Sequence, residues 1–358
     1  MGDLCLVINL GSSSVKAALV DSTGAFSWHG SRSLAREDVL EEVLDSWLTP
    51  AIAPHQQRLE RIGHRIVHGG ERFTAPTLIT QEVECLLREL IPLAPLHNTP
   101  ALKGLAWARQ RAPECPQWAC FDTAFHSSLP AEASTYAIPM PFRAQGFRRY
   151  GFHGINHQHV AESVAKQWQQ QGRDPTSLRL ISAHLGAGAS LAAIKGGICI
   201  DTTMGFTPLE GLVMATRSGS VDPGLLLELM REGYDADALA NTLQKESGLK
   251  GLSGLSGDMQ EIRAAAATGH NGAIQALGVF RHRLIQLLGA MAASLRGVDV
   301  LALTGGIGEY DKELQQELRE AIRWWGRVEL IVVPADEEGM IARLCSSHNT
   351  AVGSAAIR

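Results

Sequence analysis

The chain has 358 residues, of which 45% are hydrophobic and 19% charged, and its formal net charge is −5. This length suits about two domains of ordinary size, and the composition is typical of a folded globular protein. The sequence has no dense block of lysine and arginine, which is the pattern that binds nucleic acid or an anionic membrane. A small-molecule ligand is therefore favoured.

The first residues and the cysteines both predict a cytoplasmic protein. The chain enters an apolar strand pattern at once, without the basic start or the cleavage site of a signal peptide. No stretch reaches the roughly 18 apolar residues of a membrane span. The cysteines form no Cys-x-x-Cys pair, so we expect reduced, buried thiols at positions 5, 85, 115, 120, 199 and 345.

The N-terminal region is predicted to form two strands joined by a turn of small residues. Leu4 to Leu10 is apolar apart from Asn9, and Val15 to Val20 is apolar again after the turn Gly11-Ser12-Ser13-Ser14. Alternating segments then predict a sheet covered by helices, with strand-like runs at 61–67 and 119–125 and a helix from about 156 to 171.

The second half of the chain repeats this plan. Leu178 to Leu185 is apolar, the turn Gly186-Ala187-Gly188-Ala189 follows, and another apolar run ends at Ile194. The two turns begin 175 residues apart, an offset near half the chain length, which predicts a duplicated α/β domain. A core-facing helix at 274–295 and a strand at 298–303 then precede Gly305-Gly306-Ile307-Gly308.

The polar, glycine-bearing run at 143–154 is the natural domain boundary. We predict an N-terminal domain at 1–149 and a C-terminal domain at 150–358, whose last helix would pack back on the first domain. Two such halves imply a central cleft that can close.

Small residues in turns that follow strands predict phosphate binding. The candidate turns are 11–14, 186–189 and 305–308, where backbone N–H groups can approach an anion closely. One such turn usually only reverses the chain, but three in a duplicated α/β chain indicate a phosphate cleft. None is a Walker A motif, since Gly11 lacks the Gly-Lys-Ser/Thr ending and Lys16 lies on the second strand.

Two arginines flanked by small residues suggest a site for oxyanions. Arg65 lies in an apolar strand that ends in glycines, and Arg217 lies in Met214-Ala215-Thr216-Arg217-Ser218-Gly219. For either residue alone, a structural ion pair is at least as common as an anion clamp. Together they fit carboxylate and phosphoryl oxygens, which guanidinium groups bind through two parallel hydrogen bonds.

Two carboxylates and a group of histidines complete the candidates. Asp122 ends an apolar run, where a ligand-facing group is usual in an α/β sheet, although a helix N-cap is the commoner role for a single aspartate. Glu337 could simply be one of the acidic residues that are common in the first turn of a helix, and both carboxylates suit magnesium as ligands. His153, His157 and His159 favour a phosphoryl-stabilising or structural role over zinc, because no cysteine pair accompanies them.

These segments resemble the acetate kinase family over nearly the whole chain. The matching segments, in family order, are Asn9–Lys16, His64–Glu71, Ala94–Asn98, Phe121–His126, Arg149–Gly154, His184–Gly186, Asp201–Gly219 and Thr304–Glu309. The resemblance implies the duplicated actin-like α/β fold that acetate and sugar kinases share with heat-shock chaperones and actin. It also implies a homodimer, with the first domain on the acyl and phosphate side and the second domain on the nucleotide side.

The resemblance further implies residue roles. Arg65 and Arg217 would bind the carboxylate and the transferring phosphoryl group, and His153 would contact that group. Asp122 would act in catalysis with magnesium or manganese, and Asn9 and Glu337 would hold the metal. The acyl pocket would comprise Val67, Leu96, Phe152 and Pro208, with Arg65 beside it. We assign the phosphates and nucleotide to Asn9, Ser12, Ser14, Lys16, His184, Gly186, Gly188, Asp258, Gly305, Gly306, Ile307 and Gly308.

The implied reaction is reversible, direct in-line transfer of a phosphoryl group from ATP to acetate, giving acetyl phosphate and ADP. The chain departs from the family mainly on the nucleotide side, at Ala187, Ile155-Asn156, Met259-Gln260, Tyr310 and a shortened stretch between Glu309 and Pro334. A propionate kinase and a relative that uses pyrophosphate therefore stay open. A less favoured alternative is a silent nucleotide-binding regulator.

Overall fold

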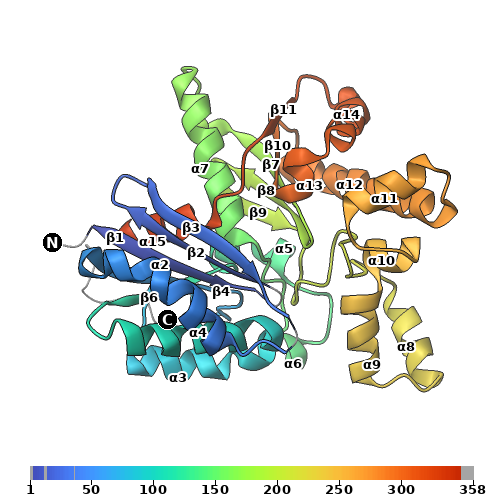
Figure 1. Cartoon of the computed structure of the whole chain (residues 1–358). Helices are drawn as coiled ribbons and strands as arrows, with labels where there is room; N and C mark the ends of the chain where they lie inside the picture. The colour runs from blue at the N-terminus through green and yellow to red at the C-terminus, as the bar shows by residue number, and fades with distance from the viewer. Residues whose placement is uncertain (1–2, 12–13, 36, 348–358) are drawn as a thin grey trace. The chain divides into compact units, whose positions relative to one another are not determined.

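The computed structural model describes residues 3–11, 14–35 and 37–347, which form two compact units (Figure 1). The first unit comprises Met1–Ser127, Phe152–His159 and Asp336–Arg358, and the second comprises Ser128–Gly151 and Val160–Ala335. The chain therefore crosses between the units more than once. The division into domains at residues 149 and 150 stays a prediction.

The first unit contains a mixed sheet in the order β3-β2-β1-β4-β6-β5. Strand β1 pairs antiparallel with β2, β2 pairs antiparallel with β3, and β1, β4 and β6 run parallel to one another. The strands are β1 (Leu4–Leu10), β2 (Ser14–Asp21), β3 (Phe26–Ser33), β4 (Leu59–Ile66), β5 (Thr77–Leu78) and β6 (Gln117–Phe121).

The second unit repeats this topology in a sheet ordered β11-β10-β7-β8-β9. Strand β7 pairs antiparallel with β8 and parallel with β10, as β1 does with β2 and β4. The strands are β7 (Arg179–Leu185), β8 (Ala189–Lys195), β9 (Ile198–Thr202), β10 (Val300–Thr304) and β11 (Glu329–Val332). The predicted duplication is thus confirmed, because β1 and β7 begin at Leu4 and Arg179, at the offset found in the sequence.

Helices accompany both sheets. The first unit contains α1 (Leu40–Val43), α2 (Thr49–Ile52), α3 (Gln81–Glu89), α4 (Pro95–Arg111) and α15 (Glu337–Ser347), and α7 (Gly154–Gln170) begins in it. The second unit contains α5 (Ala131–Ser134), α6 (Met140–Arg143), α8 (Pro223–Arg231), α9 (Ala236–Asn241), α10 (Gly248–Ser253), α11 (Met259–Ala267), α12 (Asn271–Leu295), α13 (Gly305–Tyr310) and α14 (Lys312–Ala321).

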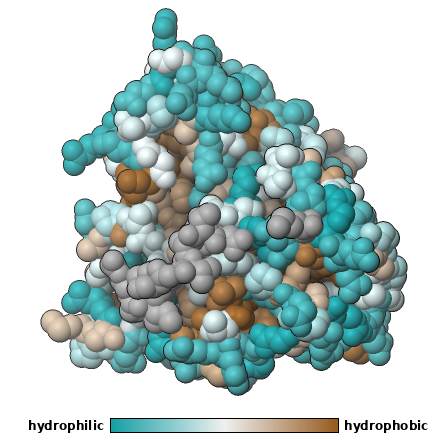
Figure 2. All heavy atoms as spheres, turned by 90° about the vertical axis from the view of Figure 1, so that its left-hand side faces the viewer, coloured by the Kyte–Doolittle hydropathy of each residue, from teal (hydrophilic) through white to brown (hydrophobic). Residues whose placement is uncertain are grey.

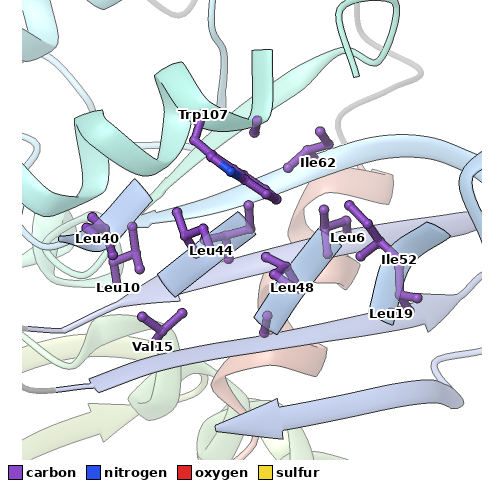
Figure 3. Packing of buried hydrophobic residues seen from close by; sticks show 13 residues of the cluster. Leu6, Leu10, Val15, Leu19, Leu40, Leu44, Leu48, Ile52, Ile62 and Trp107 are labelled. Atoms are coloured by element: carbon purple, nitrogen blue, oxygen red, sulfur yellow. The ribbon is translucent and has the colours of Figure 1, made fainter. Parts of the chain in front are cut away.

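The first sheet buries both of its faces. Because side chains alternate along a strand, Leu6, Ile8 and Leu10 of β1 point to one face, where they pack with Val15 and Leu19 of β2, with the segment from Leu40 to Ile52, and with Trp107 of α4 (Figure 3). Cys5 and Val7 point to the other face and pack against Ile341 and Cys345 of α15. The next residue on that face is Asn9, which places a polar group where the α15 side of the sheet ends.

Two element predictions differ from the structure. The strand-like run at 119–125 ends as β6 at Phe121, and a short 3₁₀ turn, Ala124–Ser128, follows. Residues 305–308 form the start of helix α13 rather than a simple turn. Glycine is a poor helix former, so the sequence pattern did not indicate this helix; the Glu309 carboxylate and the Gln315 amide hold its ends.

The surface seen in Figure 2 is mainly hydrophilic, with apolar residues in scattered patches. Among the described residues, no helix is both long enough and apolar enough to span a lipid bilayer.

Candidate active site

Three polar side chains lie at the ends of parallel strands of the first sheet, on the face that α15 covers. Asn9 is near the end of β1, Arg65 is near the end of β4, and Asp122 directly follows β6. Gly63 of β4 lies under Ile341 and Cys345, and Cys120 of β6 contacts Cys345, so the residues two positions later, Arg65 and Asp122, project from that same face. Ligands of open α/β sheets bind at such carboxyl ends.

Arg65 and Asp122 form a buried ion pair. The Arg65 Nε atom donates to both carboxylate oxygens at 3.2 and 3.1 Å, and Nη2 donates to Oδ2 at 2.6 Å. The Asp122 side chain is 1% exposed and that of Arg65 is 15% exposed. The aspartate is therefore sealed in the protein, while the guanidinium still reaches the surface. The Asp122 carboxylate thus pairs with Arg65, and its predicted roles stay predictions.

Asn9 connects this pair to the first turn of α15. Its Oδ1 atom accepts from Arg65 Nη1 at 3.1 Å, and its Nδ2 atom donates to Glu337 Oε2 at 2.9 Å and to Glu338 Oε1 at 2.7 Å. Asn9 is itself 3% exposed. The Asn9 side-chain amide thus bonds to the Arg65 guanidinium through its oxygen and to two carboxylates through its nitrogen.

Burial and charge act on the ionisation of the pair in opposite directions. Burial lowers the pKa of Arg65, but the carboxylates of Asp122 and Glu337 outweigh this effect and raise the pKa overall, so the guanidinium is charged. Burial raises the pKa of the Asp122 carboxyl above its ordinary value, and Arg65 opposes that shift. Arg65 is therefore a cation available to an anionic ligand.

The predicted apolar pocket residues of the first unit differ in exposure. Val67 and Phe152 are buried, whereas Leu96, at the start of α4, is 47% exposed. Next to Phe152, His153 adopts a φ of 57°, and the N–H of Gly154 donates to the Asp122 carbonyl at 2.9 Å. A Cβ at position 154 would lie 2.1 Å from that oxygen, so only glycine allows the His153 backbone to approach Asp122 so closely.

The second unit supplies Arg217 and Pro208. The half-buried guanidinium of Arg217 donates from Nη1 to the Pro208 carbonyl at 3.2 Å. Met214 and Gly248 enclose the Arg217 backbone: the Met214 N–H donates to the Arg217 carbonyl at 3.1 Å, and a Cβ at Gly248 would lie 2.7 Å from the same oxygen. The loop that contains Pro208 therefore fixes the arginine head group.

Small residues end the strands of the second sheet, as the sequence predicts for a phosphate site. His184 lies near the end of β7, and the N–H of Gly186 bonds to the Gly188 carbonyl at 3.0 Å in the turn to β8. Gly305 begins α13 directly after β10, with a φ of 79°, and a Cβ there would lie 2.8 Å from the Leu185 carbonyl. Gly306, Ile307 and Gly308 follow in the same helix.

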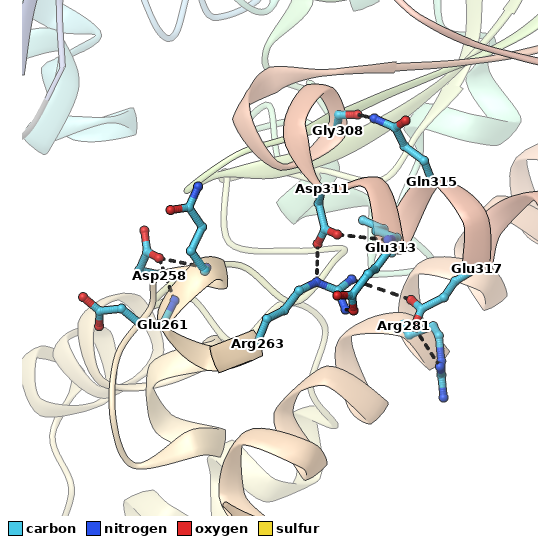
Figure 4. A network of polar contacts seen from close by, with 11 residues as sticks. Asp258, Glu261, Arg263, Arg281, Gly308, Asp311, Glu313, Gln315 and Glu317 are labelled. Atoms are coloured by element: carbon cyan, nitrogen blue, oxygen red, sulfur yellow. Dashed lines mark hydrogen bonds and ion pairs between the residues drawn. The ribbon is translucent and has the colours of Figure 1, made fainter. Parts of the chain in front are cut away.

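Polar contacts connect α11, the helix that Asp258 caps, to this glycine helix through α14 (Figure 4). Asp258 caps α11, whose Arg263 donates from Nε to Asp311 Oδ2 at 2.7 Å. Asp311 caps α14, and Gln315 of α14 donates to the Gly308 carbonyl at 3.0 Å. The Asp258 side chain thus has a structural role as an N-cap, and its predicted role at the nucleotide stays a prediction.

The remaining predicted ligands are placed as follows. Lys16 of β2 pairs in register with Asn9 and is exposed, and Ser14 begins the same strand. Ser12 lies outside the described residues. Glu338 is a candidate that we did not predict. Its only sequence signal was its position beside Glu337 at a helix start, whereas the structure shows both carboxylates on Asn9.

The oxygen atoms around Asn9 fit a hard divalent cation. Magnesium prefers a few carboxylate or amide oxygens together with water and phosphate, and Glu337, Glu338 and Asn9 offer such atoms within one hydrogen-bonded group. No cluster of three or more His, Cys, Asp or Glu side chains suited to a metal occurs in the part of the chain that the structure describes. Phosphate and water would therefore have to supply the other ligands.

Comparison with known proteins gives consistent results. Residues 30–342 match the acetokinase family. An acetate kinase of Synechococcus sp. is 51% identical over 259 residues, which are 72% of this chain and 64% of that protein. The crystal structure of Porphyromonas gingivalis acetate kinase matches with a TM-score of 0.86 and 34% identity, covering 98% of this chain and 100% of that one. The structure of a propionate kinase from Francisella tularensis matches with a TM-score of 0.88 and 33% identity, covering 96% and 99%. The chain belongs to the acetokinase family.

Proposed function

We propose that this enzyme transfers a phosphoryl group reversibly between ATP and acetate, forming acetyl phosphate and ADP. Membership of the acetokinase family makes it a phosphotransferase with a carboxyl group as acceptor. The observation that carries the proposal is the setting of Arg65. Its bonds to Asp122 and Asn9 use the Nε–H and one N–H on each terminal nitrogen. A guanidinium has five N–H donors, so one donor on each terminal nitrogen remains for ligand oxygens.

The reaction needs positioning and charge neutralisation more than proton transfer. A carboxylic acid with a pKa of about 4 to 5 is already ionised at neutral pH, so no general base has to create the nucleophile. Arg65 and Arg217 bind and orient the carboxylate and the phosphoryl oxygens and offset their negative charge during in-line transfer. His153 donates to the phosphoryl group, and Asp122 keeps the Arg65 guanidinium in one orientation.

Magnesium, or manganese in its place, belongs to the same proposal. Asn9, Glu337 and Glu338 would hold the ion, which neutralises charge on the nucleotide phosphates when bound. Asn9 Nδ2 donates to both glutamates, which keeps the two carboxylates together at the start of α15.

Propionate is the alternative acceptor. Val67, Leu96, Phe152 and Pro208 form the proposed acyl pocket, and a propionate kinase is among the similar structures. One methylene in a hydrophobic pocket is worth only about 1 to 3 kcal/mol of discrimination. We propose acetate as the preferred acid because acetate kinases are among the most similar relatives, and turnover on both acids measures the preference.

The phosphoryl donor is proposed to be ATP, with pyrophosphate as the alternative. The departures Met259, Gln260 and Tyr310 lie on elements of the nucleotide side, α11 and α13, and Tyr310 is 72% exposed. The glycine helix α13 is nevertheless present, and Gln315 of α14 and the Arg263–Asp311 pair position it. Because the Tyr310 side chain points to solvent, it is not packed over the glycines of this helix, which supports a retained nucleotide site.

A cytoplasmic homodimer is part of the proposal. Helix α8 contains no buried residue, yet its Leu225, Leu227 and Met230 are each about half exposed. Apolar groups gathered on an uncovered helix are typical of a protein–protein interface. A second copy of the chain is the partner we propose, and analytical ultracentrifugation of the wild type and of a Leu227→Glu variant tests it.

Acyl phosphate formation, trapped as the hydroxamate, tests the main proposal. Purified protein with magnesium and acetate is assayed in parallel with ATP and with pyrophosphate, and then with propionate as acceptor. Product with ATP and acetate is the expected result, and Arg217→Ala should remove most of it while the fold survives. Product with pyrophosphate but not with ATP would show that pyrophosphate is the phosphoryl donor. Nucleotide binding without product under any condition would favour the regulatory alternative.

A further inference from the structure

Three polar side chains in the second unit secure the loop from Thr203 to Gly211. The Tyr136 hydroxyl donates to Glu210 Oε2 at 2.5 Å, and Glu210 Oε1 accepts from Arg149 Nη2 at 2.7 Å. Arg149 Nη1 donates to the carbonyl oxygens of Thr203 and Met204 at 3.1 and 3.0 Å. The carboxylate near the end of the loop is thus connected, through Arg149, to the backbone where the loop begins.

The middle of the loop is built closely around this network. The N–H of Phe206 donates to the Tyr136 hydroxyl at 2.9 Å. At Gly205 a Cβ would lie 1.8 Å from Glu210 Oε2 and 2.1 Å from the Tyr136 oxygen, so no other residue fits without displacing both. The Gly205 carbonyl accepts from the N–H of Tyr150 at 3.1 Å. The loop therefore has one backbone position relative to Tyr136 and Arg149.

Tyr136 and Arg149 are held beside each other by the backbone. An isolated bridge pairs Thr135 with Arg148, and the Arg149 N–H donates to the Ser134 carbonyl at 2.8 Å. Burial, reinforced by the Glu210 carboxylate, raises the pKa of Tyr136 above its ordinary value. The hydroxyl thus keeps its proton at neutral pH and serves as a donor to Glu210 and as an acceptor for Phe206.

The secured loop carries two groups of the proposed reaction. Pro208, two residues after Phe206, is a proposed pocket residue, and its carbonyl accepts from Arg217 Nη1 at 3.2 Å. A shift of the Phe206 backbone would therefore move the ring of Pro208 and the acceptor that orients Arg217 together. We infer that Tyr136, Glu210 and Arg149 are positioning residues that set the selectivity of this enzyme between short carboxylic acids.

This inference rests on the proposed function and predicts a change in selectivity. Tyr136→Phe removes one hydroxyl, which leaves the Phe206 N–H and one Glu210 oxygen without this partner. The loop then loosens around Pro208, which favours the longer acid. We expect the ratio of kcat/KM for propionate to that for acetate to rise by about tenfold, within the range that one methylene spans in a tight pocket. The KM for ATP should stay unchanged.

The test compares Tyr136→Phe, Glu210→Gln and a matched Tyr234→Phe control. Tyr234 is also in the second unit but is 46% exposed and lies outside the loop, so its variant should keep the wild-type ratio. Thermal unfolding establishes that each variant is folded. If Tyr136→Phe does not fold, Glu210→Gln still tests the inference, because an amide keeps the size of the carboxylate but weakens its bonds to Tyr136 and Arg149. Folded network variants with the wild-type acid ratio would overturn the inference.

Hydrogen exchange separates this inference from the proposed reaction. The Phe206 amide should lose protection in Tyr136→Phe but not in Tyr234→Phe, and this measurement requires no turnover. A wild-type protein without acyl phosphate formation would refute the proposed function, while unchanged protection of Phe206 in Tyr136→Phe would refute the network itself.

Discussion

The pair formed by Arg65 and Asp122 allows a structural ion pair to be distinguished from an anion clamp. Arg65→Ala leaves a carboxylate that is 1% exposed without its guanidinium bonds. Breaking a buried pair on one side typically costs about 3 to 5 kcal/mol of unfolding free energy. Asp122→Asn should cost less, about 1 to 3 kcal/mol, because Arg65 is partly exposed and keeps its bond to Asn9.

The double variant Arg65→Ala/Asp122→Asn removes both charges and should therefore recover part of the loss. We expect it to be more stable than Arg65→Ala alone, which gives a coupling free energy of about 2 kcal/mol in a double-mutant cycle. Urea unfolding at pH 7, with the wild type and the three variants at the same protein concentration, measures this quantity. Losses of unfolding free energy that are additive, with no coupling between the two substitutions, would contradict the ion pair.

Activity measured on the same proteins determines the role of Arg65. A residue that only pairs with Asp122 would regain turnover when the double variant regains stability. A residue that binds substrate oxygens would not, and we expect both variants that lack Arg65 to lose at least about a hundredfold in kcat/KM, as removal of one oxyanion donor does in other enzymes. Recovered turnover in the double variant would refute the proposed role of Arg65.

Three further predictions follow from local geometry. Arg263→Ala breaks the bond between α11 and Asp311. In steady-state assays the KM for ATP should therefore rise several-fold while the KM for acetate stays constant. Equal changes in both KM values would contradict a role confined to the nucleotide side. Gly63→Ala places a Cβ 2.6 Å from Ile341 and 2.9 Å from the Cys345 thiol. The overpacking should lower the unfolding free energy by about 1 to 3 kcal/mol, which urea unfolding measures. The control Gly278→Ala, where a Cβ has open space, should lower it by nothing. Burial lowers the pKa of His64 to about 4 in the folded protein. The unfolded chain therefore binds a proton at His64 below about pH 6.5, whereas the folded chain binds it only below about pH 4. The unfolding free energy should therefore fall as the pH decreases through this window, with a smaller slope in His64→Gln.

The sequence predicted the strands that combine a clear apolar pattern with a turn of small residues. Strands β1 and β7 match their predicted runs closely, because Gly11 and Gly186 mark where each run ends. The end of β6 and the start of α13 were missed for a physical reason. Phe125 continues an apolar pattern although the chain has already turned, and α13 begins with glycines whose helix depends on Glu309 and Gln315.

The candidate residues were easier to predict than the contacts between them. Arg65 and Asp122 each stood out as a charge in an apolar context, but they are 57 residues apart, and no local signal pairs them. The bridge from Arg65 through Asn9 to Glu338 spans still more of the chain. Only the parallel alignment of β1, β4 and β6 brings these groups to one edge of the sheet.

The two sheets share a topology but differ in the chemistry at their strand ends. At the offset of the repeat, Asn9 corresponds to His184, and β4 with its Arg65 corresponds to β10, which leads into Gly305. The first unit thus ends its strands with polar and charged side chains, which suit a small carboxylate and a transferring phosphoryl group that must be oriented individually. In the second unit glycines follow β7 and β10, and their small size suits the close approach of a longer polyphosphate. Under the proposed function, the strand ends of the first sheet would serve the acceptor and those of the second sheet the donor, while a loop of the second unit adds Arg217 and Pro208 for the acceptor. Changes at Ala187 and Tyr310 would then affect the donor.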